Sequence, residues 1–133
     1  MNDADPTGLR IQVWEYELPG GWLVLAGKTD ADNDRLSLKV AKPNDWWFHS
    51  RGTSGSHVVL KAQEGREPDR EVLRQAAAIA AHHSKARNAR QVAVSCTRAR
   101  YVTKARGDKT GTVRIRKERI LRVKPGLPGK NDG

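Results

Sequence analysis

The amino-acid sequence predicts an α+β domain in which an antiparallel or mixed sheet carries one long helix packed on one face. Short apolar segments with strand-like alternation recur along the chain, separated by glycine, proline and polar turns. By contrast, residues 70–87 repeat apolar side chains at helical spacing over several turns. The length of 133 residues suits a single domain that can bury its own core.

The N-terminal part of the sequence predicts a β-hairpin. Residues 10–18 alternate between apolar and polar side chains, and a Pro-Gly-Gly turn separates them from a second strand at residues 22–26. We expect residues 27–34 to form a solvated turn or a helix start, because their aspartates lack the glycine and the glutamate of a calcium loop. Residues 35–41 fit either a short helix or a strand.

The rest of the chain predicts further strands around the helix. Asp69 is a suitable N-cap for the helix of residues 70–87, and Lys85 and Arg87 suit the negative end of its dipole. A basic loop at residues 106–111 joins two strands. The strand segments expected here are residues 46–49, 57–62, 91–96, 100–104, 112–116 and 120–123.

The predicted domain spans residues 10–125, between a flexible leader at residues 1–9 and a flexible tail at residues 126–133. No apolar run approaches the roughly 20 residues needed to cross a bilayer, and the acidic N-terminus does not resemble a secretory signal. Cys96 is the single cysteine, so no intrachain disulfide is expected. These features predict a cytoplasmic protein without a membrane partner.

The positive charge is concentrated in one part of the chain. The net charge is +10, and residues 85–122 alone hold 13 Lys and Arg against two acids. Residues 1–84 hold 10 basic and 12 acidic side chains. Such a polarised field attracts phosphate polymers, whereas solvated faces usually mix both signs. The sequence of this basic protein therefore predicts a polyanionic partner.

The stretch NDWWFHSRGTSGSHVVLK at residues 44–61 combines tryptophans, histidines and a glycine-serine loop. The loop suits either a phosphate cradle made of backbone N–H groups or a plain hairpin turn. Alternation along a strand places Trp46 and Phe48 on one face and Trp47 on the other. An exposed tryptophan beside arginines would offer a surface for base stacking.

The histidines of this stretch raise two chemical alternatives. Asp45, His49 and His57 supply too few ligands for a structural metal site, so we expect no metal and no cofactor. The same three residues are candidates for an enzyme that modifies or hydrolyses RNA or nucleotides, with a histidine as general base. Asp45 would orient His49 only if the strand bends, because four residues span roughly 13 Å along a straight strand. We assign no catalytic residue.

Several motifs, in order, resemble those of the NFACT-R domain, the RNA-binding part of ribosome-associated quality control factors. They are DWWFH at residues 45–49, GSHVVLK at residues 55–61, AHHSKARN at residues 81–88 in which His83 replaces a tyrosine, and YVTK at residues 101–104 followed by Gly107 and KTG at residues 109–111. The resemblance covers about residues 11–125. It implies a stand-alone RNA-binding copy, acting in translation or RNA processing, for which a protein partner would supply the missing NFACT domains.

Charge and resemblance together predict a sequence-tolerant binder of structured RNA, either tRNA or large-subunit ribosomal RNA, whose cations converge on one surface. A protein-interaction adaptor that uses the helix face is a further alternative. The residues expected to contact RNA are Arg51, Ser56, His57, Lys85, Arg87, Arg98, Arg100, Lys104, Arg106, Lys109, Arg114 and Arg116.

Overall fold

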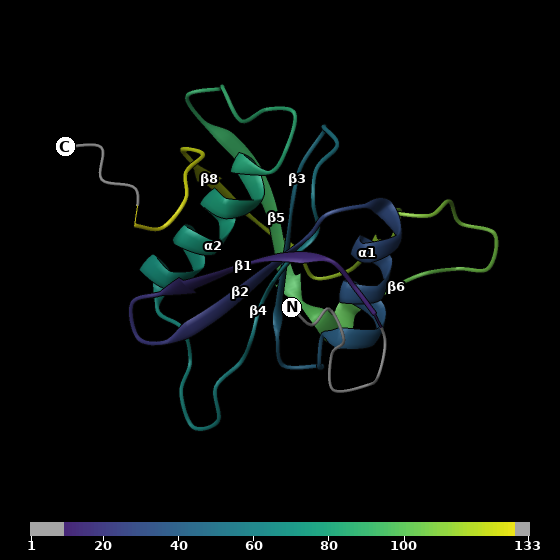
Figure 1. Cartoon of the computed structure of the whole chain (residues 1–133), viewed down its shortest axis with the longest axis horizontal. Coiled ribbons are helices and arrows are strands. Elements are labelled where there is room, and N and C mark those ends of the chain that lie inside the picture. The colour runs from purple at the N-terminus through teal and green to yellow at the C-terminus, as the bar shows by residue number, and fades with distance from the viewer. Residues whose placement is uncertain (1–9, 130–133) are drawn as a thin grey trace.

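The computed structural model describes residues 10–129 and confirms the α+β class (Figure 1). Six strands form one antiparallel sheet in the order β1-β2-β4-β3-β5-β8, and two short strands form a separate ribbon. The strands are β1 (Val13–Leu18), β2 (Trp22–Gly27), β3 (Trp46–Ser50), β4 (Val58–Leu60), β5 (Val92–Arg98), β6 (Val102–Thr103), β7 (Arg114–Ile115) and β8 (Arg119–Val123). The helical segments are α1 (Asp30–Arg35), the π-helix η1 (Leu36–Val40), α2 (Arg70–His82) and the 3-10 turn η2 (Ala99–Tyr101). The predicted leader at residues 1–9 and residues 130–133 of the predicted tail lie outside the described residues.

The expectation of one long helix is wrong. α2 ends at His82 after 13 residues, more than a turn before its predicted end. Beyond this point the His83 carbonyl accepts the Ser56 N–H at 2.9 Å, and the Lys85 N–H donates to the Ser54 carbonyl at 3.0 Å. These backbone groups are bonded to another loop, so they cannot continue the helical pattern. Among the described helices, none is long and apolar enough to span a bilayer.

Both faces of the sheet are covered, although the sequence predicted a cover on one face only (Figure 1). α2 packs on the face that carries Phe48, and its buried side chains include Val72 and Ile79. The opposite face carries Trp47, which packs with Leu36 of η1 in a second apolar cluster. The predicted alternation of Trp47 and Phe48 is confirmed, and the result is a three-layer domain.

The contacts of α1 attach the second layer, formed by α1 and η1, to the sheet. The hydroxyl of Thr29 caps the helix by accepting the Asp32 N–H at 3.1 Å. The Asp32 carboxylate in turn accepts the Gln12 N–H at 3.0 Å, which ties α1 to the segment that enters β1. The predicted helix start at residues 27–34 is confirmed. Residues 35–41, which fitted either a helix or a strand, are mostly the π-helix η1.

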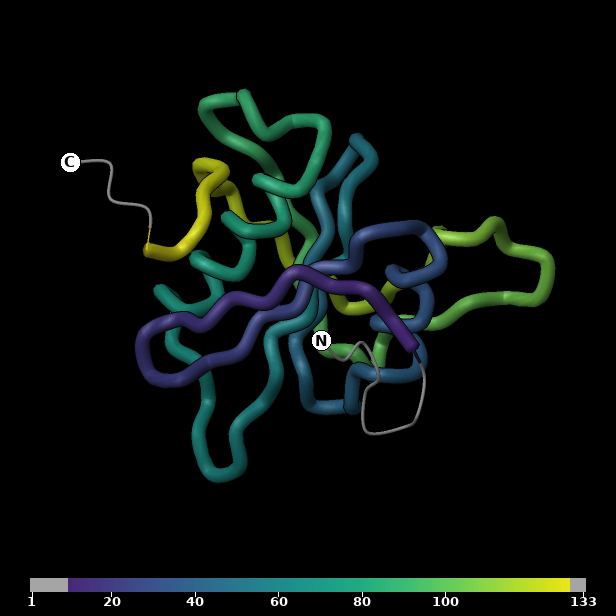
Figure 2. The backbone as a smooth tube through the Cα atoms, viewed as in Figure 1, coloured from purple at the N-terminus to yellow at the C-terminus, as the bar shows by residue number. Residues whose placement is uncertain are grey.

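The basic loop predicted between two strands projects from the body of the domain. β6 and β7 pair only through Val102 with Ile115 and Thr103 with Arg114, so the ribbon is shorter than predicted. We call residues 102–115 the basic hairpin. Its outer part extends beyond the three layers on the side of α1 (Figure 2).

Cys96, the single cysteine of the chain, lies in the core on β5. Its side chain is buried in the cluster beneath α2. Burial raises the pKa of the thiol to about 12, although the nearby Arg119 and Arg98 act in the opposite direction. The thiol is therefore protonated at neutral pH.

We expect Phe48→Ala to lower the free energy of unfolding by about 3–5 kcal/mol, because Phe48 is fully buried between the sheet and α2. Urea unfolding followed by tryptophan fluorescence measures this loss. The matched control is Leu23→Ala on β2, an apolar side chain that is 38% exposed, which should change the free energy by no more than about 0.5 kcal/mol. Equal effects of the two substitutions would contradict the assignment of the core.

Candidate nucleic-acid interface

A cleft of about 640 Å³ opens where the C-terminal end of α2, residues 51–57 and β1 meet. We call residues 51–57 the glycine loop. Lys85, Arg87 and Asn88 line the cleft from the segment that follows α2, and Trp14 lines it from β1. Among the described residues, no aspartate or glutamate lines this cleft. It is therefore a cationic opening with an aromatic wall.

Gly55 permits the close contact that shapes the cleft. It forms an isolated antiparallel bridge with Ser84, directly after α2. A β-carbon at position 55 would lie 2.7 Å from the Ser84 β-carbon and 2.9 Å from the His83 carbonyl oxygen, which is closer than side chains pack. Any larger residue would therefore push the glycine loop away from Lys85 and widen the cleft.

Trp14 is the wall residue that sequence reasoning missed. Its indole is 39% exposed and stacks on the His83 ring with a centroid distance of 4.3 Å and an angle of 16°. The Tyr16 hydroxyl lies 2.6 Å from His83 Nε2 and holds that ring in place. Burial, with smaller contributions from neighbouring positive charges, lowers the pKa of His83 to about 4. At neutral pH His83 is an uncharged support for the tryptophan.

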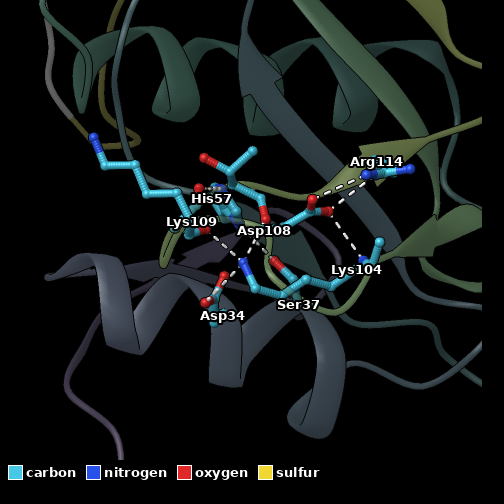
Figure 3. A network of polar contacts seen from close by, with 10 residues as sticks. Asp34, Ser37, His57, Lys104, Asp108, Lys109 and Arg114 are labelled. Carbon is cyan, nitrogen blue, oxygen red and sulfur yellow. Dashed lines mark hydrogen bonds and ion pairs between the residues drawn. The ribbon is translucent and has the colours of Figure 1, made fainter.

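His57 and Ser56, which the sequence predicted at the RNA surface, are both buried in the glycine loop. Ser56 donates its hydroxyl to the Gly27 carbonyl at 2.6 Å. The His57 Nδ1 accepts the Ser37 hydroxyl at 2.8 Å, and its Nε2–H donates to the Gly111 carbonyl at 3.1 Å (Figure 3). Ser56 therefore ties the glycine loop to β2, and His57 ties it to the basic hairpin.

A chain of hydrogen bonds fixes the tautomer of His57, and burial keeps its ring neutral. Trp47 donates its indole N–H to the Ser37 oxygen at 2.8 Å, which leaves the hydroxyl proton of Ser37 for His57 Nδ1. Burial, followed by the charge of His49, lowers the pKa of His57 to about 4. His57 is thus neutral at pH 7 with both ring nitrogens bonded.

The constellation proposed for an enzyme is not assembled. Asp45 is buried, forms an ion pair with Lys61, and accepts the Ala62 N–H at 2.8 Å. Its carboxylate is therefore committed to the β4 end rather than to His49. The rings of His49 and His57 do meet edge to face, with centroids 5.4 Å apart. Within residues 10–129, no group of three His, Cys, Asp or Glu side chains is placed to hold a metal ion.

Two of the predicted contact residues in the basic hairpin are engaged in internal ion pairs (Figure 3). Lys104 lies 3.3 Å from Asp34 of α1 and also donates to two carbonyls of the hairpin loop. Arg114 makes a two-point contact with Asp108 at 2.9 Å for each bond. The Arg114 hydrogen bond lowers the pKa of the Asp108 carboxyl. These pairs keep the loop in shape.

The twelve predicted contact residues do not form one surface. Pairing along the sheet places Trp46 beside Arg98 at one end of β3, whereas Ser50 lies beside Val94 at the end where the glycine loop begins. The sequence showed the concentration of charge but not the strand directions that distribute it. Four of the twelve belong to the cleft or its loop, namely Arg51, Ser56, Lys85 and Arg87, and His57 lies beneath the hairpin. Four belong to the hairpin, namely Lys104, Arg106, Lys109 and Arg114. The remaining three lie near the far end of β5, namely Arg98, Arg100 and Arg116.

Fold and site together define a small α+β module with a cationic cleft suited to an anionic ligand. Residues 13–117 match the family described as the NFACT protein RNA binding domain, and the chain belongs to this family. The resemblance drawn from the tryptophan-histidine and Ser-Lys-Ala-Arg motifs is thereby confirmed.

Curated relatives and a solved structure agree with this assignment. The chain is 37% identical over 110 residues to the Rqc2 homolog RqcH of Bacillus subtilis and 40% identical over 106 residues to that of Streptococcus suis. These matches cover 83% and 80% of this chain but 19% of each relative. The structure of the C-terminal part of the fibronectin/fibrinogen-binding protein from Streptococcus suis superposes with a TM-score of 0.80 at 37% identity, covering 89% of this chain and 48% of that one.

We expect the stability of the domain to fall as the pH drops from about 6.5 to about 4. His57 has a pKa of about 4 when folded and near 6.5 when unfolded, so the unfolded chain binds more protons in this window. The loss attributable to His57 is roughly 3 kcal/mol. Urea midpoints at several pH values measure it. His57→Gln should flatten part of the pH dependence, and a slope unchanged by that substitution would refute the buried neutral state.

Proposed function

We propose that this domain binds structured RNA, namely tRNA or large-subunit ribosomal RNA, in ribosome-associated quality control. The observation that carries the proposal is the cleft, in which Lys85, Arg87 and the exposed Trp14 face one opening without a carboxylate among the described lining residues. Membership of the NFACT RNA binding domain family supports the same conclusion.

The cleft offers two kinds of contact that RNA requires. Lys85 and Arg87 are exposed and suit phosphate oxygens, with Arg51 at the rim of the glycine loop. Trp14 offers an indole face on which an unpaired base stacks, because its ring is already fixed in position by His83. The Lys28 ammonium group lies over the same indole, 5.4 Å from its centroid, so a cation is available to the phosphate of a base that stacks there.

The basic hairpin offers a further contact with the RNA backbone. Its exposed tip residues Arg106 and Lys109 extend away from the three layers, while the ion pair of Lys104 with Asp34 fixes the base of the loop. Charged tips of this kind attract phosphates irrespective of base sequence. We therefore propose sequence-tolerant binding of RNA shape rather than recognition of a base sequence.

RNA binding is the part of the quality-control task that we assign to this chain. The relatives named RqcH are about five times as long as the matched region, which covers 19% of their length. We propose that further steps on the ribosome depend on the other NFACT domains, supplied by a protein partner or by other parts of the same polypeptide. The cytoplasm is the compartment in which we expect this binding.

We expect tRNA affinity to fall steeply between low and moderate salt, because each phosphate contact releases counterions. In Lys85→Ala/Arg87→Ala, the slope of log K against log salt should decrease by about two. Filter binding or anisotropy with bulk deacylated tRNA measures this slope. The matched control, Arg35→Ala/Lys39→Ala on the α1–η1 layer, should change the slope by less than about one. A flat salt response of the unmodified domain, or no retention of tRNA at low salt, would overturn the proposal.

We expect Trp14→Ala to weaken binding of a single-stranded RNA by about 1–3 kcal/mol, because one stacked base loses its platform. Leu23→Ala is the matched control, since Leu23 is 38% exposed on the neighbouring strand β2 and lines no part of the cleft. Anisotropy with a labelled oligonucleotide gives both dissociation constants. Equal losses for the two variants would show that Trp14 contributes only general apolar surface.

A further inference from the structure

A second cluster of cations and aromatic rings lies outside the cleft. The guanidinium groups of Arg98 and Arg119 lie 4.0 Å and 5.1 Å from the centroid of the partly buried Trp46 ring. Arg98 is held there by the Asn44 carbonyl at 2.7 Å and by Glu67 at 2.8 Å. Guanidinium groups stacked on an indole keep N–H donors at their edges, so they remain able to bind phosphate.

The turn between β7 and β8, which leads directly into Arg119, carries a second group of cations beside an aromatic ring. Arg116 and Lys117 lie 5.5 Å and 5.8 Å from the centroid of the Tyr101 ring. Lys117 has a φ of +56°, the one left-handed non-glycine residue among those described, which is an unfavourable backbone conformation for a lysine. The Thr97 hydroxyl, 2.7 Å from the Arg116 carbonyl and 3.3 Å from that of Lys117, holds the turn against this strain. The turn is therefore fixed with two cations beside an aromatic ring.

We call the two parts together the Trp46 surface, which comprises Trp46, Arg98, Arg100, Tyr101, Arg116, Lys117 and Arg119. Its Trp46 part lies at the opposite end of α2 from the cleft, because Arg98 pairs with Glu67 before the first turn of that helix and the cleft begins at its last residue. Thirteen helical residues extend about 20 Å. Figure 2 likewise shows the connection before α2 and the one after it at opposite ends of the domain. One bound nucleotide cannot contact both regions.

We propose that the Trp46 surface is a second RNA contact, so that one domain holds two RNA segments at the same time. This inference rests on the proposed function of the cleft. The surface carries five cations. Of the carboxylates described beside it, Glu67 is paired with Arg98, and Glu118 accepts a hydrogen bond from the Ser95 hydroxyl. Arginines stacked on two aromatic rings match the alternation of phosphates and bases along RNA better than they match an acidic peptide, which offers charge without stacking groups.

The test is capture of a second RNA by a domain that already holds one. Bulk deacylated tRNA is fixed to beads, saturated with protein and washed, and fluorescent tRNA is then added. The variant for the Trp46 surface is Arg116→Ala/Lys117→Gly, in which glycine preserves the left-handed turn without strain. Lys85→Ala/Arg87→Ala removes the cleft contacts, and Arg35→Ala/Lys39→Ala is the matched control. Urea midpoints confirm that each variant is folded.

We expect the unmodified domain and the control to capture the second tRNA. Each of the other variants should still bind fixed tRNA yet lose capture of the second by about tenfold or more. Full capture by Arg116→Ala/Lys117→Gly would overturn the inference, since it would mean that a dimer joins two clefts or that the hairpin supplies the second contact. A domain that binds one tRNA but never two overturns the inference alone, whereas a domain that binds no tRNA overturns the proposed function as well.

Discussion

The pairing of the glycine loop with the end of α2 is the constraint on which the rest of the site depends. Two backbone hydrogen bonds, from Ser56 to His83 and from Lys85 to Ser54, divert the chain out of the helix. Lys85 and the following residues consequently leave the helix axis and line an opening instead of a buried face. The absence of a side chain at Gly55 allows this approach. Lys85 and Arg87, which the sequence analysis placed in the helix, therefore line the cleft instead.

The buried hydrogen bonds of His57 show that this residue, a catalytic candidate in the sequence, instead holds other segments of the chain in position. Trp47, Ser37 and His57 form a polar chain across the second layer that ends at the Gly111 carbonyl of the basic hairpin. Each donor in this chain has one acceptor, so a neutral imidazole is satisfied without solvent. A charged ring would carry a proton on Nδ1, so the Ser37 hydroxyl proton would lose its acceptor there. The geometry therefore favours a fixed hairpin over proton transfer.

Sequence reasoning succeeded where local chemistry decides and failed where distant segments meet. The N-cap at Asp69 and the opposite faces of Trp47 and Phe48 follow from neighbouring residues, and both are present in the structure. The end of α2 depends on a loop nearly thirty positions earlier, which no periodicity encodes. Trp14 enters the cleft for the same reason, because only the fold brings β1 beside His83. The clustering of charge in the sequence also failed to predict a single cationic surface, because the two ends of β5 lie at opposite ends of its pairing with β3.

The burial of Cys96 has a practical consequence for work on this domain. Because its thiol is enclosed by the core and protonated at neutral pH, it is a poor nucleophile toward maleimides and resists oxidants. A cysteine introduced at an exposed position, such as the tip of the basic hairpin, would therefore react selectively without removal of the natural one. Fluorophores, spin labels or photoactivatable groups can then be attached at one chosen site in an otherwise unaltered protein.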